Sequence, residues 1–197
     1  TDLVDHQTFG FMDLETREPL RDDAIYRMAS NTKLVTSVAL MMLQEEGLFD
    51  LDDPLAKFIP EFGELQVLQP DATTAADVHP AKNLISIRHL LSHSAGLSYG
   101  FVEPDSVIDQ CYLNGGVNGL GEKDIDLEEL CAGIAKLPLA FEPGTSWRYS
   151  FATDVCARLV EVLSGQSFDA FLRQRIFDPL GMMDTDFWVP QEKAHRL

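Results

Sequence analysis

The chain has 197 residues, of which 45% are hydrophobic and 24% are charged, as in a globular domain and unlike a disordered or fibrous protein. Its 32 acidic residues outnumber 15 basic ones, so the formal net charge is −17. A surface this acidic repels phosphate groups, and we expect neither a nucleic-acid partner nor an anionic-membrane partner. The longest charge-free apolar stretch, residues 34–43, is too short to span a bilayer.

The N-terminal residues show no basic segment followed by an apolar core, so no signal peptide is visible. The cysteines are Cys111, Cys131 and Cys156, an odd number at wide spacing, which argues against a disulfide framework or a metal cluster. We therefore expect buried thiols in a reducing compartment, and a cytoplasmic location.

In chain order, the first expected element is a strand over residues 8–12 that has no partner nearby. Residues 30–46 are apolar nearly all round and end at Gly47, which predicts a deeply buried helix. We expect residues 64–82 and 99–123 to be loops and a strand to begin at 185–189. Further helices are expected over residues 55–59, 85–92, 127–136, 153–163 and 168–177. The pattern predicts a helical body between two strand-like ends, with no sheet of its own.

Ser30 and Lys33 form an S-x-x-K pattern at the start of the first long helix. Residues three apart on a helix share one face, and a helix N-terminus favours developing negative charge. Lys33 is followed at once by apolar residues, which favour its neutral form, and a neutral amine can take the proton of a serine. A capping serine with a solvated lysine is the alternative, but the context favours a nucleophile with its base.

A second candidate nucleophile, Ser98, lies in a G-x-S-x-G pattern that fits the nucleophile elbow. The elbow needs a buried strand before the serine and a helix directly after it. Here a helix is expected before Ser98, and Pro104 hinders an immediate helix after it. The catalytic triad of that motif also requires an acid and then a histidine further along the chain, and the only later histidine is His195. We therefore favour Ser30 over Ser98.

Three weaker patterns have simple structural explanations. His89 and His93 have helical spacing, but Leu90 stands where a zinc protease has glutamate. The glycine spacing of residues 116–121 resembles a phosphate loop, but Glu122 occupies the position of its lysine. A helix cap and solvated acids explain the remaining cluster, Asp50, Asp52 and Asp53. We expect no metal site.

Four segments in order along the chain resemble the serine β-lactamase superfamily, nearest to its class C-like and penicillin-binding-protein-like branch. The segments are residues 26–33 with 47–54, then 87–97, 142–150 and 177–182. Residues 87–97 are similar to the branch's LLxHxSGL segment, and residues 142–150 contain the counterpart of its second catalytic motif.

The resemblance implies an α+β fold of the β-lactamase/transpeptidase type, with the chain supplying mostly the helical domain and one edge of the α/β domain. Residues 1–25 would be a partial strand and turn of the α/β domain, and residues 26–184 the helical domain with both motifs. Residues 185–197 would begin a strand of the sheet. Most of the antiparallel sheet and the family's third motif would be missing, so the chain looks truncated at both ends.

The roles implied by the resemblance are an acylated nucleophile for Ser30, an activating lysine for Lys33, and a general base or proton shuttle for Tyr149. β-Lactamases have asparagine two positions after this tyrosine, whereas this chain has Phe151. That departure is similar to the family VIII carboxylesterases, which often carry an unused G-x-S-x-G. Phe151 and Trp147 are the residues expected to contact substrate.

The expected function is that of a serine hydrolase that forms an acyl-enzyme, acts on small carboxylic esters and needs no cofactor. One alternative is a β-lactamase or D,D-peptidase-like penicillin-recognising enzyme, with an amide substrate. The other is an inactive fragment or a non-catalytic binding domain of the same fold. Without the late strand, we expect these residues alone to be poorly active. The uncovered apolar face of helix 30–46 would favour self-association, or a second chain that completes the sheet.

Overall fold

The computed structural model describes residues 4–117 and 125–197 and is mostly helical. Its helices are α1 (Thr32–Glu45), α2 (Ile87–Leu91), α3 (Val107–Asn114), α4 (Leu127–Ile134), α5 (Ala152–Ser164) and α6 (Phe168–Leu172). Shorter turns are the 3-10 helices η1 (Ala29–Asn31), η2 (Leu55–Lys57), η3 (Pro60–Gly63) and η5 (Gln191–Arg196), and the π-helical turn η4 (Arg173–Phe177) that extends α6. Strands β1 (Gln66–Leu68) and β2 (Val78–Pro80) pair antiparallel, with Val67 opposite His79.

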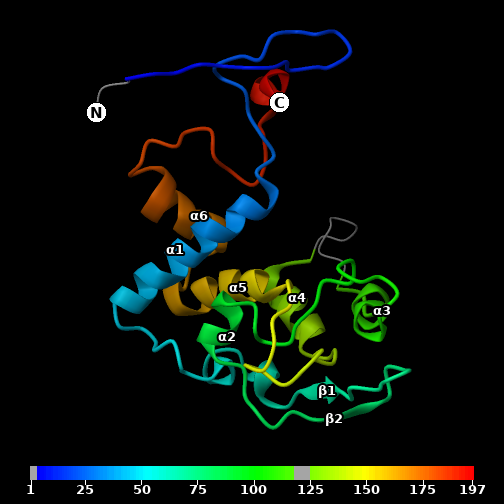
Figure 1. Cartoon of the computed structure of the whole chain (residues 1–197). Coiled ribbons are helices and arrows are strands. Elements are labelled where there is room, and N and C mark those ends of the chain that lie inside the picture. The colour runs from blue at the N-terminus through cyan, green and yellow to red at the C-terminus, as the bar shows by residue number, and fades with distance from the viewer. Residues whose placement is uncertain (1–3, 118–124) are drawn as a thin grey trace.

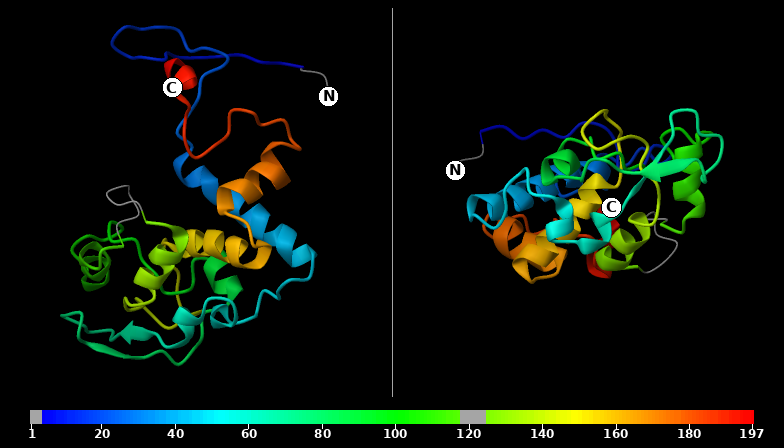
Figure 2. Two further views of the ribbon diagram at one scale, coloured as in Figure 1. Left: turned by 180° about the vertical axis from the view of Figure 1, so that it is seen from behind. Right: turned by 90° about the horizontal axis from the view of Figure 1, so that it is seen from below.

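Helix α5 is the centre of the helical body and contacts α1, α2, α4 and α6. The β1–β2 pair lies at the opposite end of the molecule from the two chain termini (Figure 1). The N-terminal segment and η5 lie side by side, beyond the helices, in the views of Figures 1 and 2. A hydrogen bond from Ile25 N to Arg196 O, 2.7 Å long, joins them.

The sequence of α5 explains its central place, because small and branched apolar residues recur on more than one face. Its buried residues are Ala152, Val155, Cys156, Ala157, Leu159 and Val160. Full burial of a valine or leucine side chain stabilises a fold by about 1.5–3 kcal/mol relative to exposure. Gly165 ends the helix in the left-handed conformation, with φ +68°.

Helix α1 is buried on one side only. Ala39, Leu40 and Leu43 face the core, whereas Leu34 is 70% exposed and Val38 is 53% exposed. The expectation of a deeply buried helix therefore holds for one side only, and the outer apolar face is uncovered. With 14 residues α1 is much shorter than a bilayer requires, and no helix in the described ranges has the length and apolar character of a membrane span.

The described loops differ from expectation in two places. Residues 64–82 contain the β1–β2 pair, and residues 99–123 contain α3, whose first turn is capped by Ser106 accepting from Asp109 N. Three-residue strands are too short for alternation to reveal. The glycine pattern beginning at Gly116 lies largely outside the described residues, as does Glu122.

The two segments expected to be strand-like are irregular. Residues 8–12 contribute only an isolated antiparallel bridge between Phe11 and Pro19, and residues 185–189 form no strand. A strand holds its shape only with a hydrogen-bonded neighbour, and neither segment has a paired strand among the described residues.

All three cysteines are free thiols in the structure. Cys131 and Cys156 are buried and Cys111 is half-buried, in line with the expected structural role. Burial raises the pKa of Cys131 to about 12, so its thiol stays protonated and unreactive near neutral pH.

We predict that Gly96→Ala is much more destabilising than Gly165→Ala. Both glycines have positive φ, +85° and +68°, but a Cβ at Gly96 would lie 2.5 Å from Phe141 O, whereas Gly165 has open space. The conformational strain common to both costs about 1–2 kcal/mol, and the clash should add about 1–3 kcal/mol. Urea unfolding followed by circular dichroism measures both, and equal losses would contradict the close approach at Gly96.

Candidate active site

Ser30 lies in the 3-10 turn η1, immediately before α1, and its side chain is exposed. The preceding residue, Ala29, has φ +43°, a left-handed conformation that costs a non-glycine residue about 1–2 kcal/mol. Strain of this kind is often found at functional sites, where the surrounding structure enforces it. Here it turns the chain sharply into α1 and leaves the Ser30 hydroxyl accessible.

Tyr149 meets Ser30 although 119 residues separate them. Tyr149 lies in the segment that leads into α5, and Ser30 lies at the start of α1, so the packing of α1 on α5 brings them together. The Ser30 Oγ and Tyr149 Oη atoms are 2.5 Å apart, at the short end of O–H···O hydrogen bonds. A proton can pass directly between these two oxygens.

Lys33 completes the group from the first turn of α1 and is half-buried. Its Nζ lies 4.7 Å from the centre of the Tyr149 ring and 5.3 Å from the centre of the Tyr99 ring. An ammonium group this close to two aromatic rings is attracted by their electron-rich faces. The structure thus places the side chains of Ser30, Lys33 and Tyr149 close to one another.

The electrostatics around Tyr149 favour ionisation of its phenol. Burial disfavours the charged phenolate, but hydrogen bonding to Lys33 and Ser30, together with the charge of Lys33, lowers the Tyr149 pKa below its ordinary value. A phenol with a lowered pKa is a better general base near neutral pH.

Two residues beside this group were missed by sequence reasoning, Tyr99 and Asp154. The Tyr99 ring packs against the rings of Tyr149 and Phe151, at centroid distances of 5.3 and 4.4 Å, and its hydroxyl donates to Asp154 Oδ2 at 3.1 Å. Burial raises the pKa of Asp154, and the Tyr99 hydrogen bond and the charge of Lys33 oppose that rise. Tyr99 belongs to the G-x-S-x-G stretch and directly follows Ser98.

The His93 ring lies beside Tyr149, and Trp147 lies beside His93. The His93 ring centre is 5.1 Å from that of Tyr149, and Trp147 packs edge-on against His93 at 6.2 Å. Burial, followed by the positive charge of Lys33, lowers the pKa of His93, so its ring is neutral near pH 7. Trp147 is 65% exposed and lies outside the cavity lining described next.

A cavity of about 660 Å³ opens in front of the Ser30 hydroxyl, a size typical of small-molecule sites. Phe151 lines it although only 4% of its surface is exposed. Aromatic and aliphatic side chains form much of the wall. They are Tyr99, Phe101, Ile125, Leu127, Leu130, Tyr149, Phe151, Ala157, Phe168 and Phe187, and the acidic lining residues are Asp126, Asp154, Glu161 and Asp169.

Ser98, in contrast, is fully buried and does not line the cavity. Its Oγ donates to Asp109 Oδ1 and accepts from Arg148 Nε at 2.8 Å. A nucleophile must be reachable by substrate, and this hydroxyl is enclosed by protein. The preference for Ser30 over Ser98 is consistent with this geometry.

The histidine and aspartate patterns have structural roles. His89 Nδ1 accepts from Ser86 N in a capping box at the start of α2, whereas His93 lies beyond the helix end. Asp53 accepts from Asp50 N and from Lys57. Among residues 4–117 and 125–197, no group of three or more histidine, cysteine, aspartate or glutamate side chains is arranged to hold a metal ion.

Comparison with known proteins places the chain in a family. Residues 2–197 match the family model described as Beta-lactamase. The chain is 35% identical over 179 residues to Esterase EstB of Burkholderia gladioli, covering 90% of this chain and 42% of that protein. The chain thus spans less than half the length of that relative.

Two solved structures have the same fold over nearly the whole chain. EstCE1, described as a hydrolase with promiscuous acyltransferase activity, superposes with a TM-score of 0.76 at 29% identity, over 93% of this chain and 45% of that one. Simvastatin synthase (LovD) from Aspergillus terreus gives 0.71 at 28% identity, over 93% and 44%. The fold is therefore of the β-lactamase/transpeptidase type that the motifs indicated, and the chain belongs to the β-lactamase family, near its esterase branch.

Proposed function

We propose that the protein is a serine hydrolase that cleaves small carboxylic esters through an acyl-enzyme on Ser30. The observation that carries the proposal is the 2.5 Å contact between Ser30 Oγ and Tyr149 Oη, with the ammonium group of Lys33 beside it at the mouth of a cavity. The similarity to proteins named as an esterase and a hydrolase supports the same reaction class.

In the acylation step, Ser30 Oγ attacks the ester carbonyl carbon and passes its proton to the ionised Tyr149 oxygen. Lys33 favours this proton transfer because its charge lowers the Tyr149 pKa. The start of α1 places a partial positive charge near the developing oxyanion. The alcohol then leaves with the proton that Tyr149 returns, so the C–O bond to the alcohol breaks as the bond to Ser30 forms.

In the deacylation step, water takes the position of the departed alcohol. Tyr149 accepts a proton from this water while the water oxygen attacks the acyl carbon. The bond between the acyl carbon and Ser30 Oγ then breaks, Tyr149 returns the proton to Ser30, and the carboxylic acid leaves. No metal or organic cofactor takes part in either step. The same three residues therefore serve both halves of the cycle.

The cavity wall favours an ester over a β-lactam as the substrate. Phe151 occupies the position where β-lactamases have the asparagine of their second motif, and its ring lines the cavity beside Tyr99. An apolar ring can pack against an acyl chain but offers no partner to a side-chain amide.

A related outcome is transfer of the acyl group to an alcohol instead of water. The description of EstCE1 as a hydrolase with promiscuous acyltransferase activity points to acyl transfer in a protein of this fold. The chemistry at Ser30 is unchanged, and the choice depends on which hydroxyl compound reaches the acyl-enzyme. We propose hydrolysis as the main reaction and transfer as the second candidate.

We predict that a fluorophosphonate probe labels Ser30 in the protein at its full natural length. Ser30→Ala should abolish both labelling and nitrophenyl acetate hydrolysis, because the attacking oxygen is lost. Ser98→Ala is the matched control and should keep the label, since Ser98 is fully buried. Peptide mapping by mass spectrometry locates the label, and a label on Ser98 would overturn the assignment.

Lys33→Met and Tyr149→Phe should each lower turnover by about a hundredfold or more, the usual scale of general acid–base catalysis. Lys33→Met should also shift the part of the pH profile in which kcat/KM rises with pH, so that the rise occurs at higher pH. The sign follows because Lys33 lowers the Tyr149 pKa, so its removal raises that pKa. Initial rates between pH 6 and 10 test this, and a profile that stays in place would remove Lys33 from the proton-transfer step.

Phe151→Asn should raise the ratio of nitrocefin turnover to nitrophenyl acetate turnover by about tenfold, because an amide partner replaces an apolar wall. The ratio does not depend on the fraction of protein that folds, which matters for a residue that is 4% exposed. Phe151→Leu is the control and should leave the ratio close to that of the parent. A lower ratio in Phe151→Asn would contradict this role of Phe151.

A further inference from the structure

The serine of the G-x-S-x-G pattern belongs to a buried polar group that the proposed reaction does not use. We call Ser98, Asp109 and Arg148 the anchor cluster. Ser98 and Asp109 have no exposed surface, and the Arg148 side chain is 12% exposed. Buried polar groups of this kind must be fully hydrogen-bonded to be tolerated.

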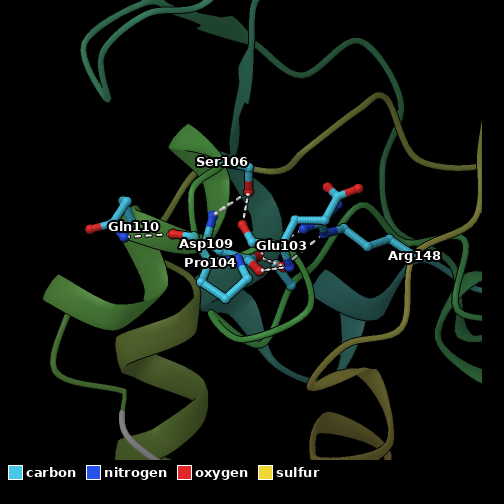
Figure 3. Close-up of polar contacts among 7 residues, drawn as sticks. Glu103, Pro104, Ser106, Asp109, Gln110 and Arg148 are labelled. Atoms are coloured by element: carbon cyan, nitrogen blue, oxygen red, sulfur yellow. Dashed lines mark hydrogen bonds and ion pairs between the residues drawn. The ribbon is translucent and has the colours of Figure 1, made fainter.

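The anchor cluster meets that condition. Asp109 Oδ1 accepts from Ser98 Oγ and from Arg148 Nη2, the latter at 2.9 Å, and Asp109 Oδ2 accepts from Glu103 N at 2.6 Å. Arg148 Nη1 also donates to Glu103 Oε2 at 2.8 Å, a contact visible in Figure 3. All three guanidinium nitrogen atoms of Arg148 and both carboxylate oxygens of Asp109 are therefore hydrogen-bonded, so Arg148 is held in one position.

The cluster is connected to both sides of Tyr149. Arg148 precedes Tyr149 in the chain, and its backbone N–H donates to His93 O at 2.9 Å. On the other side, Phe151 N donates to Ser98 O at 3.3 Å. Ser98 thus binds Arg148 through its side-chain hydroxyl and Phe151 through its backbone carbonyl, and these two residues flank Tyr149 in the chain.

The hydrogen bond between Ser30 and Tyr149 depends on this placement, and it tolerates little displacement of either side chain. Ser30 Oγ and Tyr149 Oη are 2.5 Å apart, and a displacement of about 1 Å would remove the hydrogen bond. Misplacement on that scale can lower an enzyme's rate by about a hundredfold. Tyr149 itself is half-buried at a cavity edge, so its neighbours must supply the rigidity.

We propose that the anchor cluster positions Tyr149 against Ser30, and that Ser98 takes part in the reaction only through this placement. The inference rests on the proposed function. It makes Arg148, Asp109 and Ser98 positioning residues that touch no substrate atoms, and it predicts that their effect on rate passes through the Tyr149 hydroxyl.

The test is a double-mutant cycle in the protein at its full natural length, with Arg148→Met, Tyr149→Phe and the double variant. Turnover of nitrophenyl acetate gives kcat and KM, and the rate of fluorophosphonate labelling measures Ser30 reactivity independently. We expect Arg148→Met to lower kcat about tenfold with little change in KM. In the Tyr149→Phe background the further loss should be less than about twofold, because coupled residues are not additive.

Arg196→Met is the matched control. Arg196 pairs with Asp23 and Asp184, and its side chain is 15% exposed, close to the 12% of Arg148. It lies in η5 and is not among the residues that line the cavity. Its replacement should leave kcat and the labelling rate unchanged, so a general effect of losing a paired arginine would be recognised.

Ser98→Ala is the second variant, for the case that Arg148→Met fails to fold. It removes one oxygen atom, and we expect kcat to fall about threefold while the label stays on Ser30, with that loss absent in the Tyr149→Phe background. An equal loss in both backgrounds, or unchanged kcat in Arg148→Met and Ser98→Ala, would overturn the inference. If Tyr149→Phe itself is fully active or Ser30 stays unlabelled, the proposed function fails instead.

Discussion

The packing of α1 against α5 is the contact on which the candidate site depends. Ser30 precedes α1 and Tyr149 precedes α5, so the register between these helices determines whether the two hydroxyl groups can meet. Both helices carry buried aliphatic residues, including Leu40 of α1 and Leu159 of α5, and the two helices are in contact. Because protein interiors are close-packed, this register is well defined, and the short Ser30–Tyr149 contact follows from it.

Lys33 is the second feature on which the candidate site depends, because its one positive charge influences the pKa values of several neighbouring groups. Among the described residues that line the cavity it is the only basic one, in a chain with a net charge of −17. Its ammonium group lowers the pKa of Tyr149, contributes to the lowered pKa of His93 and opposes the burial-driven rise of the Asp154 pKa. A single cation in a partly desolvated pocket can do this because its charge is screened weakly there.

Ser98 shows why a short motif needs its structural context. The five residues of a G-x-S-x-G pattern are the same letters whether the serine ends a buried strand or lies, as here, in a loop after a helix. In this chain the hydroxyl is enclosed and bound to Asp109 and Arg148. The same stretch also supplies Tyr99, whose ring lies against Tyr149 and whose hydroxyl binds Asp154.

The sequence by itself determined the features that depend only on residues close together along the chain. The helix expected over residues 153–163 appears as α5, and Ser30 and Lys33 of the S-x-x-K pattern lie at the start of α1. Motif resemblance added Tyr149, which no local rule connects to Ser30. The β1–β2 pair, the place of Asp154 and the anchor cluster were decided only by tertiary structure. Three-residue strands carry too little pattern to detect, and the partners of Asp154 and Arg148 lie about 40 to 55 residues away in sequence, where only packing determines which polar groups share a buried volume.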